Sequence, residues 1–317
     1  MSRVIHTGQA LVDVVVEVPS LPRRGQNVMA ASSTRYAGGA VNVLVAAARF
    51  GAACVHAGAH GTGPNGDLVR ASLAAEHVEV SAPAITARDT ATCLVLVEPS
   101  AERTFVTTQG AERDISVESL ATSAPVAGDL VCVTGYSLVL AETRDPLLAW
   151  LPTLDAGVVV VLDPGAAFAH LPAEVRDPML AHTDVWSGNA EEAADLLAAL
   201  GRPLEDGADS MSAPAHALAP LLRGDAVTIV RDGPAGCAVT LRGETTLLPG
   251  FPQKAVDTNG AGDTHTGALV ADVAAGHGWV DACRRANAAA AIKVTRRGPA
   301  TAPTAAEVEQ FLAERER

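Results

Sequence analysis

From residue 130 onward the chain alternates between short β-branched runs and longer runs rich in Ala and Leu. The strand-like runs cover residues 130–134, 158–163, 184–187 and 226–230, and the helical runs cover residues 147–154, 190–200 and 213–222. This alternation predicts a parallel sheet with helices on both of its faces. Aromatic residues make up only 3% of the 317 residues, so Ala, Val and Leu must build most of the core. We expect residues 1–317 to form a single domain, because this length suits one large α/β unit.

The N-terminal third of the chain predicts a second, smaller sheet. Residues 4–5 and 11–18 are β-branched runs on either side of Gly8, and they predict a core strand that passes into an extension. Residues 91–98 and 103–108 predict a hairpin. We therefore expect a small sheet from about residues 10–36 and 90–108. A sheet of two hairpins leaves one face bare, which favours a homodimer formed through it.

The charge balance excludes whole classes of partner. Acidic residues number 36 against 23 basic residues, for a formal net charge of −13. Such a chain is not expected to bind nucleic acid or an anionic membrane surface. Among the basic residues only Lys254 and Lys293 are lysines, so the charge of a bound phosphate must be met by helix ends, a metal ion and a few arginines.

The five cysteines are scattered, and no two have the spacing of metal ligands. Scattered cysteines inside apolar runs indicate reduced core residues and a cytoplasmic protein. The first residues lead straight into a strand-like run and lack the layout of a signal peptide. Charged residues, Gly or Pro interrupt every apolar run before it reaches transmembrane length.

The sequence Asp257-Thr258-Asn259-Gly260-Ala261-Gly262-Asp263 precedes an Ala-rich helical run. A glycine-rich turn that opens a helix points several backbone N–H groups and the positive end of the helix dipole at one spot, which suits a phosphate. A carboxylate beside such a site is unfavourable unless it takes a proton from the group that attacks the phosphate. Asp263 is therefore predicted to be a general base. The alternative is an ordinary turn in which Asp263 caps the helix.

Two further stretches open helices. In Gly38-Gly39-Ala40-Val41-Asn42 the paired glycines let a ligand approach the backbone, and Asn42 offers a donor and acceptors to a hydroxyl-rich ligand. A tight strand–helix junction explains the same residues. Asn189 and Glu192 have the spacing of a capping box, and Glu192 is also suited to hold Mg²⁺ through water. These last two interpretations are compatible.

Two glycine-rich turns have competing explanations. Arg231-Asp232-Gly233-Pro234-Ala235-Gly236 follows a strand-like run and could hold a nucleotide, although taken alone a simple hairpin turn explains it better. Gly61-Thr62-Gly63-Pro64-Asn65-Gly66 matches the G-x-G-x-x-G pattern of dinucleotide sites, but Pro64 interrupts the turn and Glu79 is poorly placed for a ribose. A Walker P-loop is excluded, because the chain has no Gly-Lys-Ser/Thr.

Together, four of these stretches resemble the signatures of the ribokinase-like carbohydrate kinases, also called the PfkB family. Residues 38–42 match the N-terminal signature, and residues 257–263 match the C-terminal one. Asn189 and Glu192 match the family's N-x-x-E, and Gly233 and Gly236 match its nucleotide-strand glycines. The resemblance runs from about residue 3 to about residue 305. It implies a ribokinase-like three-layer α/β sandwich, with a mostly parallel central sheet and a small β-sheet that acts as a lid.

The resemblance also implies roles for individual residues. Asp263 would take the proton of the accepting hydroxyl, and the N–H groups of Gly260, Ala261 and Gly262 would form the anion hole. The substrate would be held by Asp13, Gly38, Gly39, Asn42 and the lid residue Arg103, for which a plain surface arginine is the alternative. ATP would contact Asn189, Arg231, Gly233, Gly236, Gly260, Gly262 and Asn287. Glu192 would hold Mg²⁺ through water, and a monovalent cation, K⁺, would be bound by Asp257, Asn259 and carbonyl groups of residues 294–301.

The chain departs from ribokinases at several positions. Ala40 replaces the lysine after the glycine pair, and the residues around Tyr136 replace Gln-Leu-Glu, which argues against ribose as the substrate. Arg231 stands where many members have Thr. His265 replaces a common Phe and could either tune Asp263 or pack within its helix.

We therefore predict an ATP- and Mg²⁺-dependent kinase that phosphorylates a primary alcohol, the hydroxymethyl group of a sugar or sugar-like compound. A nucleoside kinase of the same family is the first alternative, because Ala40 and the region of Tyr136 leave room for a base. A non-catalytic sugar sensor on the kinase scaffold and an NAD-dependent dehydrogenase that uses residues 61–66 are further alternatives.

Overall fold

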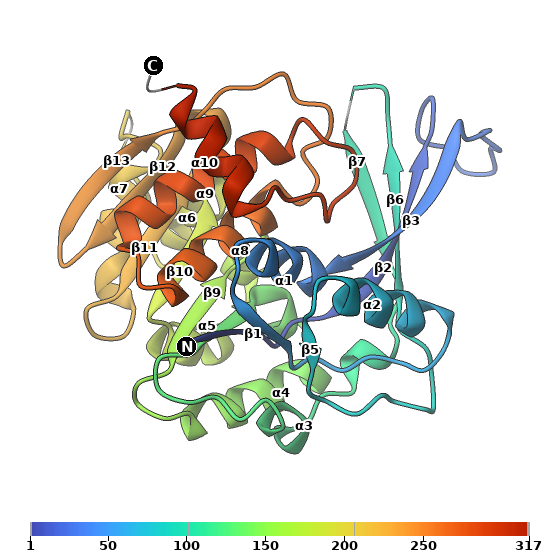
Figure 1. Cartoon of the computed structure of the whole chain (residues 1–317), viewed down its shortest axis with the longest axis horizontal. Coiled ribbons are helices and arrows are strands. Elements are labelled where there is room, and N and C mark those ends of the chain that lie inside the picture. The colour runs from blue at the N-terminus through green and yellow to red at the C-terminus, as the bar shows by residue number, and fades with distance from the viewer. Residues whose placement is uncertain (1, 101, 206, 316–317) are drawn as a thin grey trace.

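A nine-stranded sheet forms the centre of the molecule in the computed structural model, which describes residues 2–100, 102–205 and 207–315 (Figure 1). Its strands are β1 (Arg3–His6), β4 (Ala53–His56), β5 (Glu79–Val80), β8 (Leu130–Thr134), β9 (Val159–Asp163), β10 (Val185–Asn189), β11 (Val227–Arg231), β12 (Gly236–Leu241) and β13 (Glu244–Pro249). Their order is β13-β12-β11-β10-β9-β8-β1-β4-β5. The strands from β11 to β5 in this order are parallel, and β12 and β13 add an antiparallel hairpin at one edge.

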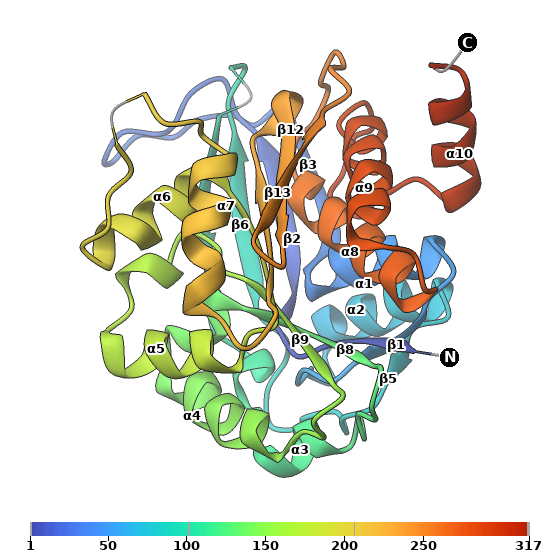
Figure 2. The same cartoon turned by 90° about the vertical axis from the view of Figure 1, so that its left-hand side faces the viewer.

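Helices cover both faces of this sheet, as Figure 2 shows. One face carries α1 (Ala40–Arg49), α2 (Pro64–Ala75), α8 (Ala261–Ala274), α9 (Trp279–Lys293) and α10 (Ala305–Ala313). The other carries α3 (Val117–Ala121), α4 (Ala141–Trp150), α5 (Ala173–His182), α6 (Ala190–Ala199) and α7 (Ser212–Leu218). Short 3-10 turns cover Ala111–Arg113, Gly135–Leu138, Leu151–Thr153, Phe168–His170, Ala219–Leu221 and Gly233–Ala235.

The buried strands explain why helices are needed on both sides. In β8, Leu130 and Cys132 belong to the hydrophobic core on the α1 and α8 side, whereas Val131 and Val133 belong to the core on the α4 and α6 side. Successive side chains of a strand point to opposite faces, so a strand that is apolar throughout must be buried twice.

A separate four-stranded sheet projects from the main body at the right of Figure 1. It consists of β2 (Ala10–Glu17), β3 (Ser32–Gly39), β6 (Thr92–Val97) and β7 (Arg103–Thr107), in the order β3-β2-β6-β7. The hairpins β2–β3 and β6–β7 are antiparallel, and β2 and β6 join them in parallel. Ala101, in the turn predicted between β6 and β7, lies outside the described residues. The three-layer sandwich and the small lid sheet confirm the predicted fold class.

On the α4 side of the sheet, two helices that contain a proline differ from the sequence-based prediction. The helix predicted at residues 147–154 begins earlier, at Ala141, and contains Pro146 as its sixth residue. α5 was not predicted at all, and it also contains a proline, Pro178, at its sixth residue. A proline inside a helix removes one hydrogen bond and is a strong breaker signal in a sequence. Here both helices pack a buried apolar face on the sheet, which offsets that cost.

Candidate active site

The glycine-rich turn before Asp263 lies at the start of α8 and leaves backbone donors available. Gly260 has a left-handed backbone with φ of 77°, and a Cβ atom there would collide with the carbonyl oxygen of Pro299. α8 then begins at Ala261 with no side-chain cap, although the N–H of Ala261, one of the three predicted anion-hole donors, already donates to the carbonyl oxygen of Thr258 at 3.2 Å. Because the first N–H groups of an α-helix have no partner within the helix, this uncapped start is suited to an anion.

Asp263 lies in the first turn of α8, and its carboxylate is held by α1. Asn42, which is 4% exposed, donates from Nδ2 to Asp263 Oδ2 at 2.8 Å. The pKa of Asp263 is raised to about 6, mainly by burial and also by the charge of Asp163, whereas the Asn42 hydrogen bond and the charges of Arg231 and Lys293 oppose this shift. A carboxyl group with a pKa in this range can accept a proton near neutral pH.

Asp13 brings a second carboxylate to this place from strand β2 of the lid. It is 8% exposed, and a Cβ atom at Gly38 on the neighbouring strand would collide with its carboxylate, so glycine provides the room. Burial, and then the charge of Asp263, raise the pKa of Asp13 to about 7. The lid and the main body therefore each present an acidic side chain to the same region. Gly39, with φ of 63°, ends β3 directly before α1.

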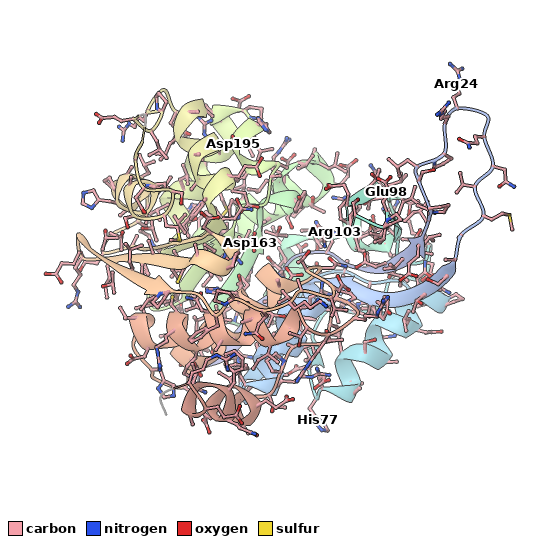
Figure 3. The ribbon with its side chains drawn as sticks, turned by 90° about the horizontal axis from the view of Figure 1, so that it is seen from above. Arg24, His77, Glu98, Arg103, Asp163 and Asp195 are labelled. Atoms are coloured by element: carbon pink, nitrogen blue, oxygen red, sulfur yellow. The ribbon has the colours of Figure 1, made fainter. Side chains whose placement is uncertain are left out.

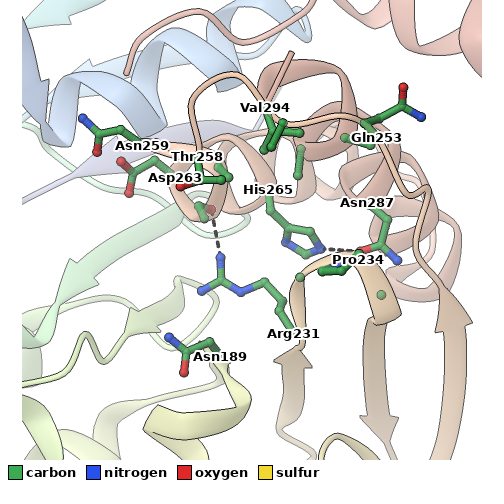
Figure 4. Close-up of a pocket in the computed structure, with 18 of the residues that line it drawn as sticks. Asn189, Arg231, Pro234, Gln253, Thr258, Asn259, Asp263, His265, Asn287 and Val294 are labelled. Atoms are coloured by element: carbon green, nitrogen blue, oxygen red, sulfur yellow. Dashed lines mark hydrogen bonds between the residues drawn. The ribbon is translucent and has the colours of Figure 1, made fainter. Parts of the chain in front are cut away.

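A pocket with a volume of about 620 Å³ opens beside Asp263 (Figure 4). It is lined by many of the predicted residues, namely Arg103, Asn189, Glu192, Arg231, Gly233, Gly236, Asn259, Gly260, Ala261, Gly262, Asp263 and Asn287. Other predicted residues lie outside this lining, namely Asp13, Gly38, Gly39, Asn42 and Asp257. The first group borders one continuous cavity. Two hydrogen bonds connect members of the second group to it, from Asn42 to Asp263 and from the N–H of Asn259 to Asp257 Oδ1.

Arg231, at the end of β11, ties the sheet to the start of α8. Its Nη1 donates to the carbonyl oxygen of Gly262 at 2.9 Å (Figure 4). Its Nε and Nη2 donate to the carbonyl oxygens of Gly188 at 3.3 Å and Ser187 at 3.2 Å. The guanidinium also lies 3.7 Å from Asp163 Oδ2. Arg231 thus fixes the pocket wall and places a positive charge beside it.

Asn189 and Glu192 form the predicted capping box at the start of α6. The N–H of Asn189 donates to Glu192 Oε2 at 2.8 Å, and the N–H of Glu192 donates to Asn189 Oδ1 at 2.8 Å. Burial, and then the charge of Asp163, raise the pKa of Glu192. Burial also raises the pKa of Asp163, which Arg231 opposes. Two carboxylates that are both destabilised in their charged form border the same side of the pocket, and such a pair is suited to a hard cation.

Comparisons with known proteins agree with this geometry. The family profile described as "pfkB family carbohydrate kinase" matches residues 1–306. The chain belongs to this family of carbohydrate kinases. It is 30% identical over 306 residues to the uncharacterized sugar kinase YegV of Escherichia coli (strain K12), covering 96% of this chain and 92% of that protein. It is 28% identical over 313 residues to a ribokinase of Haemophilus influenzae, covering 96% of each chain. Arabidopsis thaliana ribokinase, solved in complex with ribose and ATP, has a TM-score of 0.79 and 24% identity, covering 98% of this chain and 99% of that one.

The family assignment confirms the predicted class of enzyme, a phosphotransferase with an alcohol group as acceptor. The roles of its individual residues stay predictions. In this kinase, Gly233 and Gly236 have φ values of 48° and 109° and flank the turn between β11 and β12. The hairpin interpretation of that turn is therefore right, and the same turn borders the pocket.

His265 and Asn287 form a buried pair at the pocket wall of the kinase. His265 Nε2 lies 3.1 Å from Asn287 Oδ1 (Figure 4), and Asn287 Nδ2 donates to the carbonyl oxygen of Pro249 at 3.3 Å. The two side chains are 3% and 8% exposed. The hydrogen bond that holds His265 therefore runs to α9, which favours the packed histidine over a direct role at Asp263.

Arg103 reaches the pocket from strand β7 of the lid, and the residue is half-buried. Figure 3 shows Arg103 and Asp163 near the middle of the molecule, the first on the lid and the second on the central sheet. Arg103 therefore borders the pocket, and its role in substrate binding stays a prediction.

The G-x-G-x-x-G turn of the kinase already has an internal anion. The N–H groups of Asn65 and Gly66 donate to the two carboxylate oxygens of Asp89, both at 2.9 Å. A dinucleotide site would need these donors for its pyrophosphate. The turn is therefore a structural junction at the start of α2.

Two residues of the site were missed in the sequence. Asp163 was predicted only as the end of a strand, although polar residues at the carboxyl end of a parallel strand often face a ligand. Lys293 was noted only as one of two lysines, and its place below the turn 257–263 emerges only from the fold.

No helix in the part of the chain that the structure describes is long and apolar enough to cross a membrane.

Proposed function

We propose that this kinase transfers the γ-phosphoryl group of ATP to the hydroxymethyl group of a sugar or sugar-like compound, with Asp263 as the general base. The observation that carries the proposal is the position of Asp263, next to the uncapped start of α8 and held by Asn42 at 2.8 Å. A pKa of about 6 leaves Asp263 largely ionised at neutral pH, ready to accept the hydroxyl proton.

The donor side of the proposal rests on the pocket. Its volume of about 620 Å³ lies between the anion hole at residues 260–262 and the glycines of the β11–β12 turn. Asp163 and Glu192 would hold Mg²⁺ together with the phosphates of ATP, because Mg²⁺ is usually bound through one or two carboxylates plus substrate oxygens. When bound, Mg²⁺ neutralises charge on the phosphates. Arg231 and the N–H groups of α8 supply the remaining positive potential.

The acceptor side would be formed by Asp13, Asn42 and the backbone of Gly38 and Gly39. Asn42 uses its amide nitrogen on Asp263, and its buried Oδ1 has no hydrogen-bond partner among the described residues. A substrate hydroxyl that donates to this oxygen would satisfy it. Asp13 would accept from further hydroxyls, and Arg103 on the lid would cover the substrate and exclude water.

A nucleoside acceptor is the second candidate. Tyr136 borders the pocket and is 52% exposed, so its ring could stack on a base. Product identification by mass spectrometry after incubation with ATP and a panel of sugars and nucleosides separates the two candidates. A non-catalytic sensor would give no phosphorylated product at all.

The base is tested with Asp263→Asn, which keeps the shape and the Asn42 contact but cannot take a proton. We expect kcat to fall by about 10²–10⁴-fold, with little change in thermal stability. Asp195→Asn, an exposed position on α6, serves as the control and should leave kcat unchanged. An Asp263→Asn variant with near wild-type kcat would rule out this role.

We also propose that the kinase forms a homodimer through the lid. Leu94 and Val106 are 37% and 56% exposed and lie opposite each other on β6 and β7.

The cytoplasmic location expected from the cysteines stays a prediction.

A further inference from the structure

One of the two lysines of this kinase is fully buried beneath the phosphate-binding turn. Lys293 is the last residue of α9, is 0% exposed, and donates from Nζ to the carbonyl oxygen of Asp257 at 2.9 Å. In a chain with 23 basic residues and only two lysines, a buried ammonium group at this place needs an explanation. Burying a charged group is expensive unless oxygen atoms or an opposite charge compensate it.

The groups around Lys293 supply that compensation. Burial, as the largest influence, lowers the pKa of Lys293, and the charges of Asp257 and Asp263 oppose this shift while that of Arg103 adds to it. The same ammonium lowers the pKa of Asp263. Lys293 therefore acts electrostatically on the predicted base, although it lies on a different helix.

Asp257 is the centre of a network that joins the turn to the following loop. Its Oδ1 accepts the N–H of Asn259 at 2.8 Å, and its Oδ2 accepts the N–H of Gly298 at 2.9 Å. The carbonyl oxygen of Val294 accepts the N–H groups of Val256 at 2.7 Å and Asp257 at 3.1 Å. Lys293 adds the bond to the remaining acceptor of Asp257, its carbonyl oxygen.

This network does not fit the K⁺ site expected from the sequence. K⁺ would need the oxygens of Asp257, Asn259 and carbonyl groups of residues 294–301. Of these, the acceptors of Asp257 and of Val294 already receive N–H donors. A K⁺ ion at these ligands would also lie close to the Lys293 ammonium and be repelled by it. The ammonium group offers the same charge and is permanently attached.

We propose that the Lys293 ammonium is a built-in monovalent cation that positions the anion-hole turn 257–263, so that this kinase needs no K⁺. The inference rests on the proposed function of that turn. Lys293 is a positioning residue: it touches the backbone of Asp257, and through the turn it sets the direction of the N–H groups that would bind the transferred phosphoryl group.

The first arm of the test uses the wild-type kinase. Turnover is measured at constant ionic strength in chloride salts of K⁺, Na⁺ and choline. We expect about the same kcat in all three, because a site already filled by Lys293 shows no saturable activation. Saturable activation by K⁺ of about tenfold or more over choline would overturn the proposal.

The second arm uses rescue, which a purely structural role would not show. Lys293→Ala should lower kcat by up to about 100-fold through misplacement of the turn, and K⁺ or ethylammonium should restore part of it. Lys293→Met fills the space without a charge and should lose activity without rescue. Lys254→Ala, at an exposed lysine, is the matched control and should behave as wild type in every salt. Lys293→Met with wild-type kcat would contradict the proposal.

The third arm needs no turnover, so the two proposals can fail separately. In thermal-shift measurements without substrate, K⁺ should raise the Tm of Lys293→Ala more than choline does, and should not do so for the wild type. If this holds while no alcohol is phosphorylated, the cation inference stands and the proposed function falls. A Lys293→Ala variant whose Tm responds equally to K⁺ and choline counts against the inference.

Discussion

Asp13 and Asp263 come from two different parts of the molecule and meet at the predicted acceptor site. Each has a raised pKa, about 7 for Asp13 and about 6 for Asp263, and for both the largest cause is burial. Two buried carboxylates that disfavour their charged forms are a cost to the folded protein. They suit a ligand whose hydroxyl groups donate to both, as a polyhydroxylated acceptor would.

The pH dependence of kcat/KM follows from these groups. Asp263 must be ionised to accept a proton, so activity is expected to be lost as the pH falls through about 6 and to be retained above it. Since Asp13 titrates with a pKa of about 7 and is coupled to Asp263, the acidic limb should be read as a property of the pair.

Substitution of Asn42 tests whether Asp263 is the group that sets the acidic limb of the kcat/KM profile. Its hydrogen bond lowers the pKa of Asp263, so Asn42→Ala should move the acidic limb of the kcat/KM profile to higher pH. Asp195→Asn, far from the pair on the exposed face of α6, should leave the limb in place. A limb that shifts to lower pH in Asn42→Ala would show that Asp263 is not the titrating group.

Residues of the site differ in how well the sequence predicts them. Asp263, Gly260 and Asn42 belong to short patterns whose local chemistry is visible in the chain. Asp163 and Lys293 act through partners far away in sequence, Arg231 and Asp257 respectively, so no local pattern marks them. Asp89 illustrates the converse case, because it fills a G-x-G-x-x-G turn that by its pattern could have held a pyrophosphate.

At the scale of elements, the start of α8 depends on one backbone conformation. Gly260 has a φ of 77°, and a Cβ atom at this position would collide with the carbonyl group of Pro299. Gly276, just beyond the other end of the same helix, has a φ of 96° but nothing within 4 Å of a Cβ atom. At both positions any other residue would be strained by the left-handed backbone, and only at Gly260 would its Cβ atom also collide with a neighbour.

Alanine substitutions at Gly260 and Gly276 distinguish the effect of backbone strain from the effect of moving the turn. Gly276→Ala should cost about 1 kcal/mol of folding free energy and leave kcat unchanged. Gly260→Ala should cost more and should also lower kcat by about 100-fold or more, because the turn must move to accommodate the methyl group. Urea unfolding and steady-state kinetics measure the two effects. Equal behaviour of the two variants would mean that the turn does not need its observed position.

Elements were predicted from the sequence to different degrees. The parallel strands β8 to β11 have continuous apolar runs, and their predicted positions agree with the structure to within two residues. The hairpin β12–β13 was not predicted, because β13 is mostly exposed and reads as a polar segment. α4 and α5 contain prolines, and only their packing on the sheet shows that they are helices.

At the scale of the whole molecule, the lid has two unlike faces. Asp13 of β2 and Phe105 of β7 share one face, since Asp13 pairs with Cys93 and Val95 pairs with Phe105 across the sheet. Phe105 borders the pocket, so this face is turned to the active site. The other face carries Val14, Leu94 and Val106, which lie side by side on β2, β6 and β7.

Val14 is half-buried against the main core, so the exposed part of this row is Leu94 and Val106. These two side chains are the predicted dimer surface, because neighbouring apolar side chains left in water often mark an interaction site. Leu94 is 37% exposed on the inner strand β6, and Val106 is 56% exposed on the edge strand β7. Leu94→Lys should place a charge in the centre of this row and convert the dimer to a monomer in analytical ultracentrifugation. Met29→Lys, at an apolar side chain that is 79% exposed outside the small sheet, should leave the dimer intact. Since Asp13 lies on the opposite face of the lid, the monomeric variant should keep its catalytic groups and lose activity only as far as the lid loses its position over the pocket. If the wild-type protein sediments as a monomer at micromolar concentration, the prediction of a dimer formed through Leu94 and Val106 is wrong.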